Sequence, residues 1–170
     1  MIETRAYRSP LVRGCPNVRS VSTLLFVGSS GGHLAQMWSM RSWWTEHQRA
    51  WVTFDTADAE SVLRDERVWW AYRPTTRNVP NAVRNLFLAV RVLVSFRPDV
   101  VVSTGAASAV PFFLVARLLG IRTVYVEVYD RISLATMSGR LCGPLSSLFC
   151  VQWDEQLDVY PGATVIGPLL

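Results

Sequence analysis

Short runs of apolar, β-favouring residues alternate with helical stretches along most of this chain. The runs predicted as strands cover residues 23–27, 50–54, 67–72, 99–104, 122–127, 148–153 and 163–167. Between them, the segments predicted as helices cover residues 33–47, 57–65, 81–96, 112–119 and 134–147. The run 99–104 is wholly apolar in its middle, as a parallel strand covered on both faces should be. This order predicts an α/β protein with a Rossmann-like, doubly wound and mainly parallel sheet.

A length of 170 residues suggests one compact domain, expected over residues 23–170, after a flexible arginine-containing leader over residues 1–22. The leader lacks the apolar core of a secretory signal. The longest apolar stretches are interrupted by Arg91 and Arg117, short of the ~20 residues that a spanning helix needs. We therefore expect a cytoplasmic protein, peripheral at the inner face of the membrane.

The charge and cysteine patterns limit the classes of ligand that the chain is expected to bind. The net charge is +4, and all 17 basic residues are arginines. These arginines are dispersed and belong to no nucleic-acid-binding motif, so we expect no nucleic-acid partner. The three cysteines lack the paired spacing of a zinc site, and no acidic D-x-D pair is present. We expect neither a metal nor a cofactor.

The segment VGSSGGHLAQM places small residues between the first predicted strand and the helix that follows. These residues are Gly28, Ser29, Ser30, Gly31 and Gly32. Glycine allows close approach to the backbone, and free amides at a helix start attract anions, which predicts a phosphate or diphosphate site. The alternative is a tight turn without a ligand. The loop matches neither the P-loop nor the dinucleotide fingerprint, but Asp55 after the second strand keeps nucleotide binding open.

His33 follows the glycines at the predicted start of the helix. The positive end of the helix dipole disfavours the imidazolium there, so the ring should stay neutral. A neutral imidazole can take a proton from a sugar hydroxyl, which makes His33 a candidate general base. Capping of the helix or simple binding of a phosphate is an equally supported interpretation.

Several segments together resemble one family. They are GSSGGH, VVVSTGAASAVPF, VYVEVYDR, FCVQWDE and VIGPLL, spread over residues 23–170. The combination is similar to the acceptor-side subunits of two-subunit UDP-sugar glycosyltransferases. These include the membrane-recruiting subunit of the dolichol-pathway UDP-N-acetylglucosamine transferase and bacterial exopolysaccharide and capsule relatives. It also resembles the N-terminal half of the transferase that makes lipid II.

The resemblance implies the N-terminal half of a GT-B fold, in which two Rossmann-like domains enclose the active site. The implied function is acceptor binding in an inverting glycosyltransferase. A separate donor-binding subunit would hold the UDP-sugar, and the acceptor would be a polyprenyl-diphosphate-linked sugar at a membrane surface. Two alternatives remain open: a nucleotide-binding Rossmann enzyme, and a non-catalytic membrane adaptor that recruits the catalytic partner.

The resemblance also assigns residues. Gly28 to His33 match the first glycine loop of the family, and a second small-residue loop is matched by Thr104, Gly105, Ala106 and Ser108. Glu127 and Arg131 match an E-x-x-x-R segment, and Gln152 with Trp153 matches a signature of unassigned role. Glu127 is the second candidate base. The favoured alternative for Glu127 is an ion pair with Arg131 or Arg122 that holds the loop.

The predicted helix 81–96 is apolar nearly all round, with arginines along one edge. This pattern predicts membrane contact through Arg84, Phe87, Leu88 and Arg91. The alternative is a helix enclosed between the sheet and a neighbouring element. Four tryptophans could similarly form a partner surface, although we expect at least two of them in the core; they are Trp43, Trp44, Trp69 and Trp70.

Overall fold

One sheet of seven strands organises the protein in a computed structural model that describes residues 21–75 and 77–170. The strand order is β3-β2-β1-β4-β5-β6-β7, and every pairing is parallel. The strands are β1 (Thr23–Val27), β2 (Gln48–Phe54), β3 (Val68–Ala71), β4 (Val100–Ser103), β5 (Arg122–Val126), β6 (Leu148–Val151) and β7 (Thr164–Val165). The predicted Rossmann-like sheet is therefore confirmed. Most of the expected leader, residues 1–20, lies outside the described residues.

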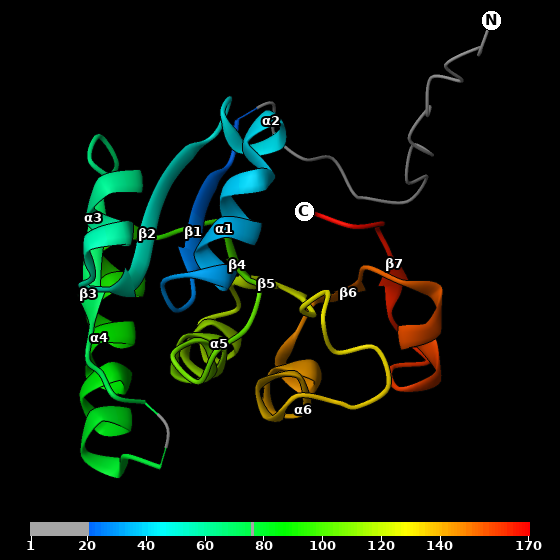
Figure 1. The fold of residues 1–170 in the computed structure, drawn as a ribbon. Coiled ribbons are helices and arrows are strands. Elements are labelled where there is room, and N and C mark those ends of the chain that lie inside the picture. Colours follow the sequence, from blue (N-terminus) through cyan, green and yellow to red (C-terminus); the bar gives the residue numbers. More distant parts are fainter. Residues whose placement is uncertain (1–20, 76) are drawn as a thin grey trace, which may run out of the picture.

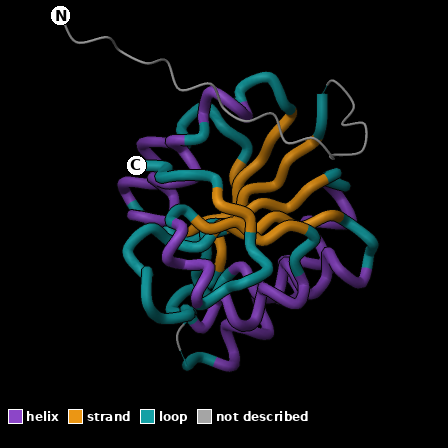
Figure 2. Tube along the Cα trace, turned by 90° about the vertical axis from the view of Figure 1, so that its right-hand side faces the viewer, coloured by secondary structure: helices purple, strands orange, loops and turns teal. Residues whose placement is uncertain are grey.

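Helices cover both faces of the twisted sheet (Figures 1 and 2). One face carries α1 (Gly32–Ser39), α2 (Arg41–Trp44) and α3 (Ala57–Val62); the other carries α4 (Val79–Phe96), α5 (Ala109–Leu118) and α6 (Met137–Cys142). Side chains alternate between the faces along a strand. In β1, Leu24 and Phe26 join the core under α1, whereas Leu25 and Val27 join the core under α4 and α5. β1 is thus a central strand buried on both sides.

The first helix is shorter than predicted, because a tryptophan side chain ends it. α1 stops at Ser39 instead of running on to residue 47, and α2 starts in a new direction at Arg41. The indole Nε1 of Trp44 donates to the carbonyl of Met37 at 2.9 Å. That bond satisfies one of the carbonyls left free at the end of a helix, so the chain can turn there while it buries Trp44.

Two helices begin earlier than predicted, each with a proline in its first turn. α4 starts at Val79 and contains Pro80, and α5 starts at Ala109 and contains Pro111. The prediction treated each proline as a boundary. The first-turn amides of a helix have no intrahelical acceptor, so proline is tolerated there. In α4 the Asn78 side chain also accepts the amide of Asn81 at 2.9 Å, which caps the helix.

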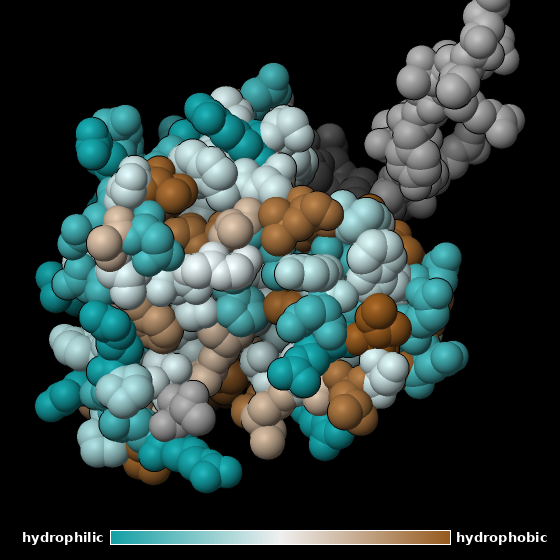
Figure 3. All heavy atoms as spheres, in the orientation of Figure 1, coloured by the Kyte–Doolittle hydropathy of each residue, from teal (hydrophilic) through white to brown (hydrophobic). Residues whose placement is uncertain are grey.

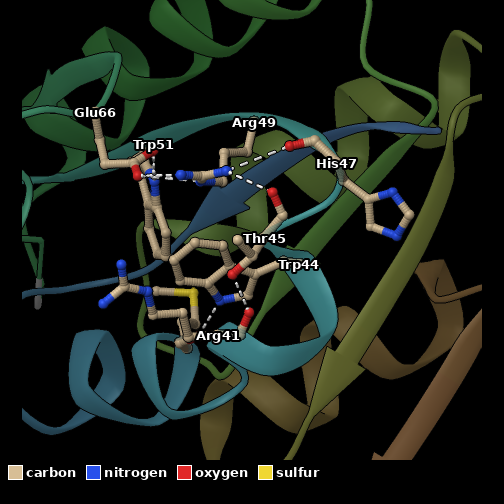
Figure 4. A network of polar contacts seen from close by, with 8 residues as sticks. Arg41, Trp44, Thr45, His47, Arg49, Trp51 and Glu66 are labelled. Atoms are coloured by element: carbon tan, nitrogen blue, oxygen red, sulfur yellow. Dashed lines mark hydrogen bonds and ion pairs between the residues drawn. The ribbon is translucent and has the colours of Figure 1, made fainter.

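An aromatic cluster forms the core between the sheet and α1–α2. Trp44 and Trp51 are fully buried and pack edge to face, with ring centroids 5.6 Å apart. Arg49 lies over the Trp44 ring at 4.5 Å and pairs with Glu66 at 2.6 Å, while Trp51 Nε1 also donates to Glu66 (Figure 4). Trp44 and the partly buried Trp69 pack into the two cores, which confirms that at least two tryptophans are structural.

Candidate functional site

The glycine loop and the second small-residue loop meet at the carboxyl edge of the sheet. They follow β1 and β4, which are neighbours in the sheet although their connections run to opposite sides. Open α/β sheets bind ligands outside the strand ends at such a switch point. Two hydrogen bonds cross it: His33 Nδ1 to the carbonyl of Thr104, and Thr104 Oγ1 to the carbonyl of His33, each 2.9 Å long. The structure thus brings together both predicted loops.

The bond to Thr104 determines the tautomer of His33. A carbonyl oxygen only accepts, so the neutral imidazole must carry its proton on Nδ1 and leave Nε2 unprotonated. Burial lowers the pKa of His33 from 6.5, against the opposing effects of the Thr104 carbonyl and of the charges of Glu127 and Asp130. At pH 7 the ring is therefore neutral, with a lone pair on Nε2, which is the state that a general base requires.

The first loop has fewer free amides than its composition suggests. The amide of Gly28 donates to the carbonyl of Val52 at 3.0 Å. Gly31, in a left-handed conformation with φ 69°, donates its amide to Asp58 Oδ2 at 2.9 Å. Hydrogen bonds from the Thr56 side chain and from this amide lower the pKa of Asp58. A carboxylate therefore lies at the start of α1, where an anionic ligand was expected.

We predict that Asp58→Asn raises the affinity of this loop for inorganic pyrophosphate about fivefold, because the substitution removes a like charge beside the expected anion site. Isothermal titration calorimetry measures the effect. Asp65→Asn is the matched control, since it changes the net charge equally but lies in the exposed segment after α3. Unchanged or weaker binding by Asp58→Asn would show that Asp58 does not compete with an anion.

The second loop holds His33 in place. Thr104, Gly105 and Ser108 are buried, and only Ala106 is partly accessible among the predicted residues. Ser103 Oγ accepts the amide of Gly105 at 3.0 Å, so that amide is also occupied. Ser108 Oγ has no partner within hydrogen-bonding distance among the described residues. In this arrangement, Thr104 positions the imidazole and does not face an open groove.

Glu127 lies at the end of β5 and is completely buried. Its carboxylate accepts hydrogen bonds from Thr136 Oγ1, Tyr160 OH and the amide of Val128. The expected ion pair with Arg131 or Arg122 is wrong. Both arginines are exposed, and within the described ranges the only ion pair is the one between Arg49 and Glu66. Hydrogen bonds from neutral groups, not a guanidinium, stabilise this carboxylate.

Three buried glutamines connect the elements that form the site, although the sequence did not predict them there. They are Gln36, Gln152 and Gln156. Gln152 Nε2 donates to Gln36 Oε1 on α1 at 2.6 Å and to the carbonyl of Glu127 at 2.8 Å. Gln152 Oε1 accepts the amide of Leu169 at 2.9 Å, and Gln156 Nε2 donates to the carbonyls of Val128 and Arg131. The signature residue Gln152 therefore joins α1, β5 and the segment after β7. The sequence signals were the uncharged amide at the end of an apolar strand and, for Gln152, the match to a family signature whose role was unassigned.

The helix predicted to touch a membrane has an exposed apolar ridge. α4 has 18 residues and a mean hydropathy of 1.3, but only 28% of it is buried, so residues 21–75 and 77–170 leave most of it uncovered. The same length and composition also occur in core helices of soluble proteins. Its exposed ridge consists of Val79, Val83, Phe87, Val90 and Val94. Hydrophobic and hydrophilic residues are intermixed over the face seen in Figure 3.

The four predicted membrane-contact residues lie together, with Phe87 on the ridge and the other three beside it. Arg84, Phe87, Leu88 and Arg91 line a hollow of about 220 Å³ together with Tyr72. The Arg84 guanidinium lies 5.8 Å from the centre of the Tyr72 ring. No acidic residue occurs in α4. The hollow is therefore lined by apolar and aromatic side chains and by two arginines, with no acidic residue from α4.

Asp55, the candidate ribose-binding residue, lies at the carboxyl end of β2 and is exposed. Hydrogen bonding to Asp55, together with its charge, raises the pKa of Glu60. Because Asp58 is on the same short helix as Glu60, acidic groups gather beside the first loop on this side. Their negative charge disfavours a nucleotide diphosphate between β1 and β2.

Comparison with known proteins finds sequence relatives that are named as sugar transferases or their subunits. The chain is 31% identical over 94 residues to the human UDP-N-acetylglucosamine transferase subunit ALG14, covering 52% of this chain and 44% of that protein. It is 27% identical over 154 residues to the UDP-N-acetylglucosamine–N-acetylmuramyl-(pentapeptide) pyrophosphoryl-undecaprenol N-acetylglucosamine transferase of Moorella thermoacetica, covering 89% of this chain and 36% of that protein. The chain thus matches less than half the length of either relative.

A solved structure shows the same fold. Acinetobacter baumannii MurG superposes with a TM-score of 0.70 at 18% identity, over 86% of this chain and 45% of MurG. At that identity the likeness concerns the fold alone. The family model for Alg14-like oligosaccharide biosynthesis proteins matches residues 67–169, more than half of the chain. With its parallel sheet and its loops at the switch point, the chain belongs to the Alg14-like family of oligosaccharide biosynthesis proteins.

Proposed function

We propose that this chain is the acceptor-binding subunit of an inverting UDP-sugar glycosyltransferase, with UDP-N-acetylglucosamine as the expected donor. The observation that carries the proposal is His33, neutral and unprotonated on Nε2 at the switch point of the sheet. Membership of the Alg14-like family and the names of the relatives support a transferase subunit. A partner subunit would hold the UDP-sugar, and the acceptor would be a polyprenyl-diphosphate-linked sugar.

The proposed reaction needs one proton acceptor. The acceptor hydroxyl oxygen attacks C1 of the donor sugar, and its proton passes to His33 Nε2. The bond between C1 and the β-phosphate oxygen of UDP breaks, UDP leaves with the electron pair, and the configuration at C1 inverts. Nδ1 keeps its proton throughout, since it remains bonded to the Thr104 carbonyl. After the products leave, His33 Nε2 gives the proton to solvent, which restores the neutral ring.

In this proposal the loops position the acceptor. The exposed amides of Gly31 and Gly32 and the half-buried Ser29 and Ser30 would contact its diphosphate. Arg131, which is exposed in the loop after β5, would pair with the anionic acceptor. Binding of the diphosphate would have to displace Asp58 from the Gly31 amide.

A transfer assay tests the proposed function. The chain is produced with a candidate donor-binding subunit from the neighbouring reading frame, and labelled UDP-N-acetylglucosamine is added with a membrane lipid extract. We expect a labelled polyprenyl-linked product from the pair and none from either chain alone. Transfer by the lone chain would contradict the two-subunit proposal. Full activity of the pair without any need for His33 would favour the membrane-adaptor alternative.

The ridge on α4 is proposed as the membrane contact, which would keep the subunit beside its lipid-linked acceptor. We predict that Phe87→Ala lowers partitioning onto anionic phosphatidylglycerol vesicles about tenfold, as expected for withdrawing one large apolar side chain from lipid. Arg84→Ala and Arg91→Ala should each weaken binding severalfold, and the loss should shrink at high salt.

Vesicle co-sedimentation measures this partitioning. Trp43→Ala is the control, because Trp43 is comparably exposed but lies on α2, on the opposite face of the sheet. Equal loss of binding in Phe87→Ala and Trp43→Ala, or none in either, would contradict a membrane contact through α4.

A further inference from the structure

Glu127 is a buried carboxylate that the proposed reaction does not use directly. Thr136 Oγ1 lies 2.9 and 3.1 Å from its two oxygens, and Tyr160 OH and the Val128 amide donate to it as well. Glu127 is completely buried, so its oxygens cannot meet an acceptor hydroxyl in this conformation. A buried charge without a cation is costly unless hydrogen bonds stabilise it.

A chain of hydroxyl groups leads from Glu127 towards His33. Tyr125 OH donates to Ser138 Oγ at 3.1 Å, and Ser138 Oγ lies 3.4 Å from Thr136 Oγ1, which donates to Glu127. Because Tyr125 and Thr136 are both donors in this chain, Ser138 donates to Thr136, and every proton points towards the carboxylate. The oxygen of Tyr125 therefore directs its lone pairs back towards the loop after β4.

The glycine at position 105 shows how close this chain comes to the imidazole. A methyl group placed on Gly105 would lie 3.1 Å from the Tyr125 hydroxyl oxygen and 2.9 Å from His33 Cε1. Tyr125 OH and the His33 ring thus border the same small space, beside the Gly105 Cα. Only a residue without a side chain leaves room for both.

We infer that Glu127 is the buried counter-charge of His33, aligned by the Tyr125–Ser138–Thr136 hydroxyl chain, and that it is a positioning residue and not the base. When His33 accepts a proton it becomes a cation inside a poorly solvated site. A fixed negative charge nearby, with hydroxyl dipoles oriented along the line between them, stabilises that cation. The inference rests on the proposed function only for its effect on rate.

The other groups that face His33 are few. Its own helix contributes the positive end of the α1 dipole and no acidic residue in the first turn. Asp130, in the loop after β5, raises the pKa of His33 as Glu127 does, but Asp130 is exposed. The Thr104 carbonyl, in the loop after β4, also raises this pKa. Burial of the ring opposes these three effects, because it lowers the pKa of His33. The test must therefore separate Glu127 from Asp130.

Imidazole NMR provides that test without a partner or substrate, since the chain has only two histidines, His33 and His47. Glu127→Gln keeps the shape and removes the charge. We expect the pKa of His33 to fall by about one unit in this variant, while that of His47 stays unchanged. Asp130→Asn should lower the pKa of His33 by much less, because Asp130 is exposed and its charge is better screened by solvent and salt.

Tyr125→Phe gives an independent reading if Glu127→Gln does not fold. It leaves the charge and the ring in place and removes only the oriented hydroxyl, so the pKa of His33 should fall by a smaller amount, about half a unit. A His33 pKa that does not change in either folded variant, or that changes no more than in Asp130→Asn, would overturn the inference. The transfer assay can succeed or fail independently of this outcome.

Discussion

Replacing His33 by alanine is expected to lower sugar transfer by the reconstituted pair about 10²–10⁴-fold, the usual contribution of a positioned general base. The expectation rests on the bond between Nδ1 and the Thr104 carbonyl, which leaves Nε2 free to accept a proton. Initial rates at saturating donor and acceptor measure the loss. The substitution also removes the Thr104 contact, so the free energy of unfolding is measured in parallel.

The pH profile separates a base from a binding residue. Activity requires the neutral imidazole, and burial lowers the pKa of His33 from 6.5. The rate of the unmodified pair should therefore be constant near pH 7 and fall only as the pH drops through that lowered pKa. The control is His47→Ala, which removes the other histidine and should change neither the rate nor the profile. An acidic limb that persists in His33→Ala would show that another group is the base.

Replacing Trp44 by alanine is expected to cost about 3–5 kcal/mol of unfolding free energy, the range for removing a buried aromatic side chain. Trp44 is fully buried, packs against Trp38 and Trp51, and caps α1 through its bond to the Met37 carbonyl. Alanine would leave a large cavity and free that carbonyl at once. A loss of this size approaches the whole stability of many domains.

The neighbouring tryptophan provides the control. Trp43 is 49% exposed, and we expect Trp43→Ala to cost only about 1 kcal/mol. Urea denaturation followed by circular dichroism measures both variants. Comparable losses for the two substitutions would contradict the core position of Trp44.

Much of the fold could be predicted because its signals are local. The apolar runs identified the strands, including 99–104 and 122–127, to within one or two residues at most ends. Helix ends were less accurate where the deciding contact was not local. Pro80 and Pro111 resembled boundaries in the sequence, yet both lie inside first turns. The end of α1 depended on the Trp44 indole, which lies seven residues after Met37 in the sequence and donates to the Met37 carbonyl.

The site was only partly predictable for the same reason. Composition indicated the first loop and His33, and the family resemblance added the second loop. Neither indicated that Asp58 would bind the Gly31 amide from 27 residues away. An ion pair for Glu127 was a reasonable expectation from the nearby arginines, and it was wrong because the chain brings the hydroxyls of Thr136 and Tyr160 to the carboxylate. These partners come from α6 and the segment before β7, and no spacing in the sequence relates them.

By itself, the sequence determined the alternation of strands and helices, the two small-residue loops and the histidine that follows the first. These properties follow from side chains acting within a few residues of their own backbone. The tertiary structure alone decided which atoms meet: Gln36 with Gln152, 116 residues apart, and His33 with Thr104, 71 residues apart. Such contacts depend on strand order in the sheet, which brings distant strand ends to one edge. The tautomer of His33, and with it the proposed chemistry, is therefore a property of the folded chain.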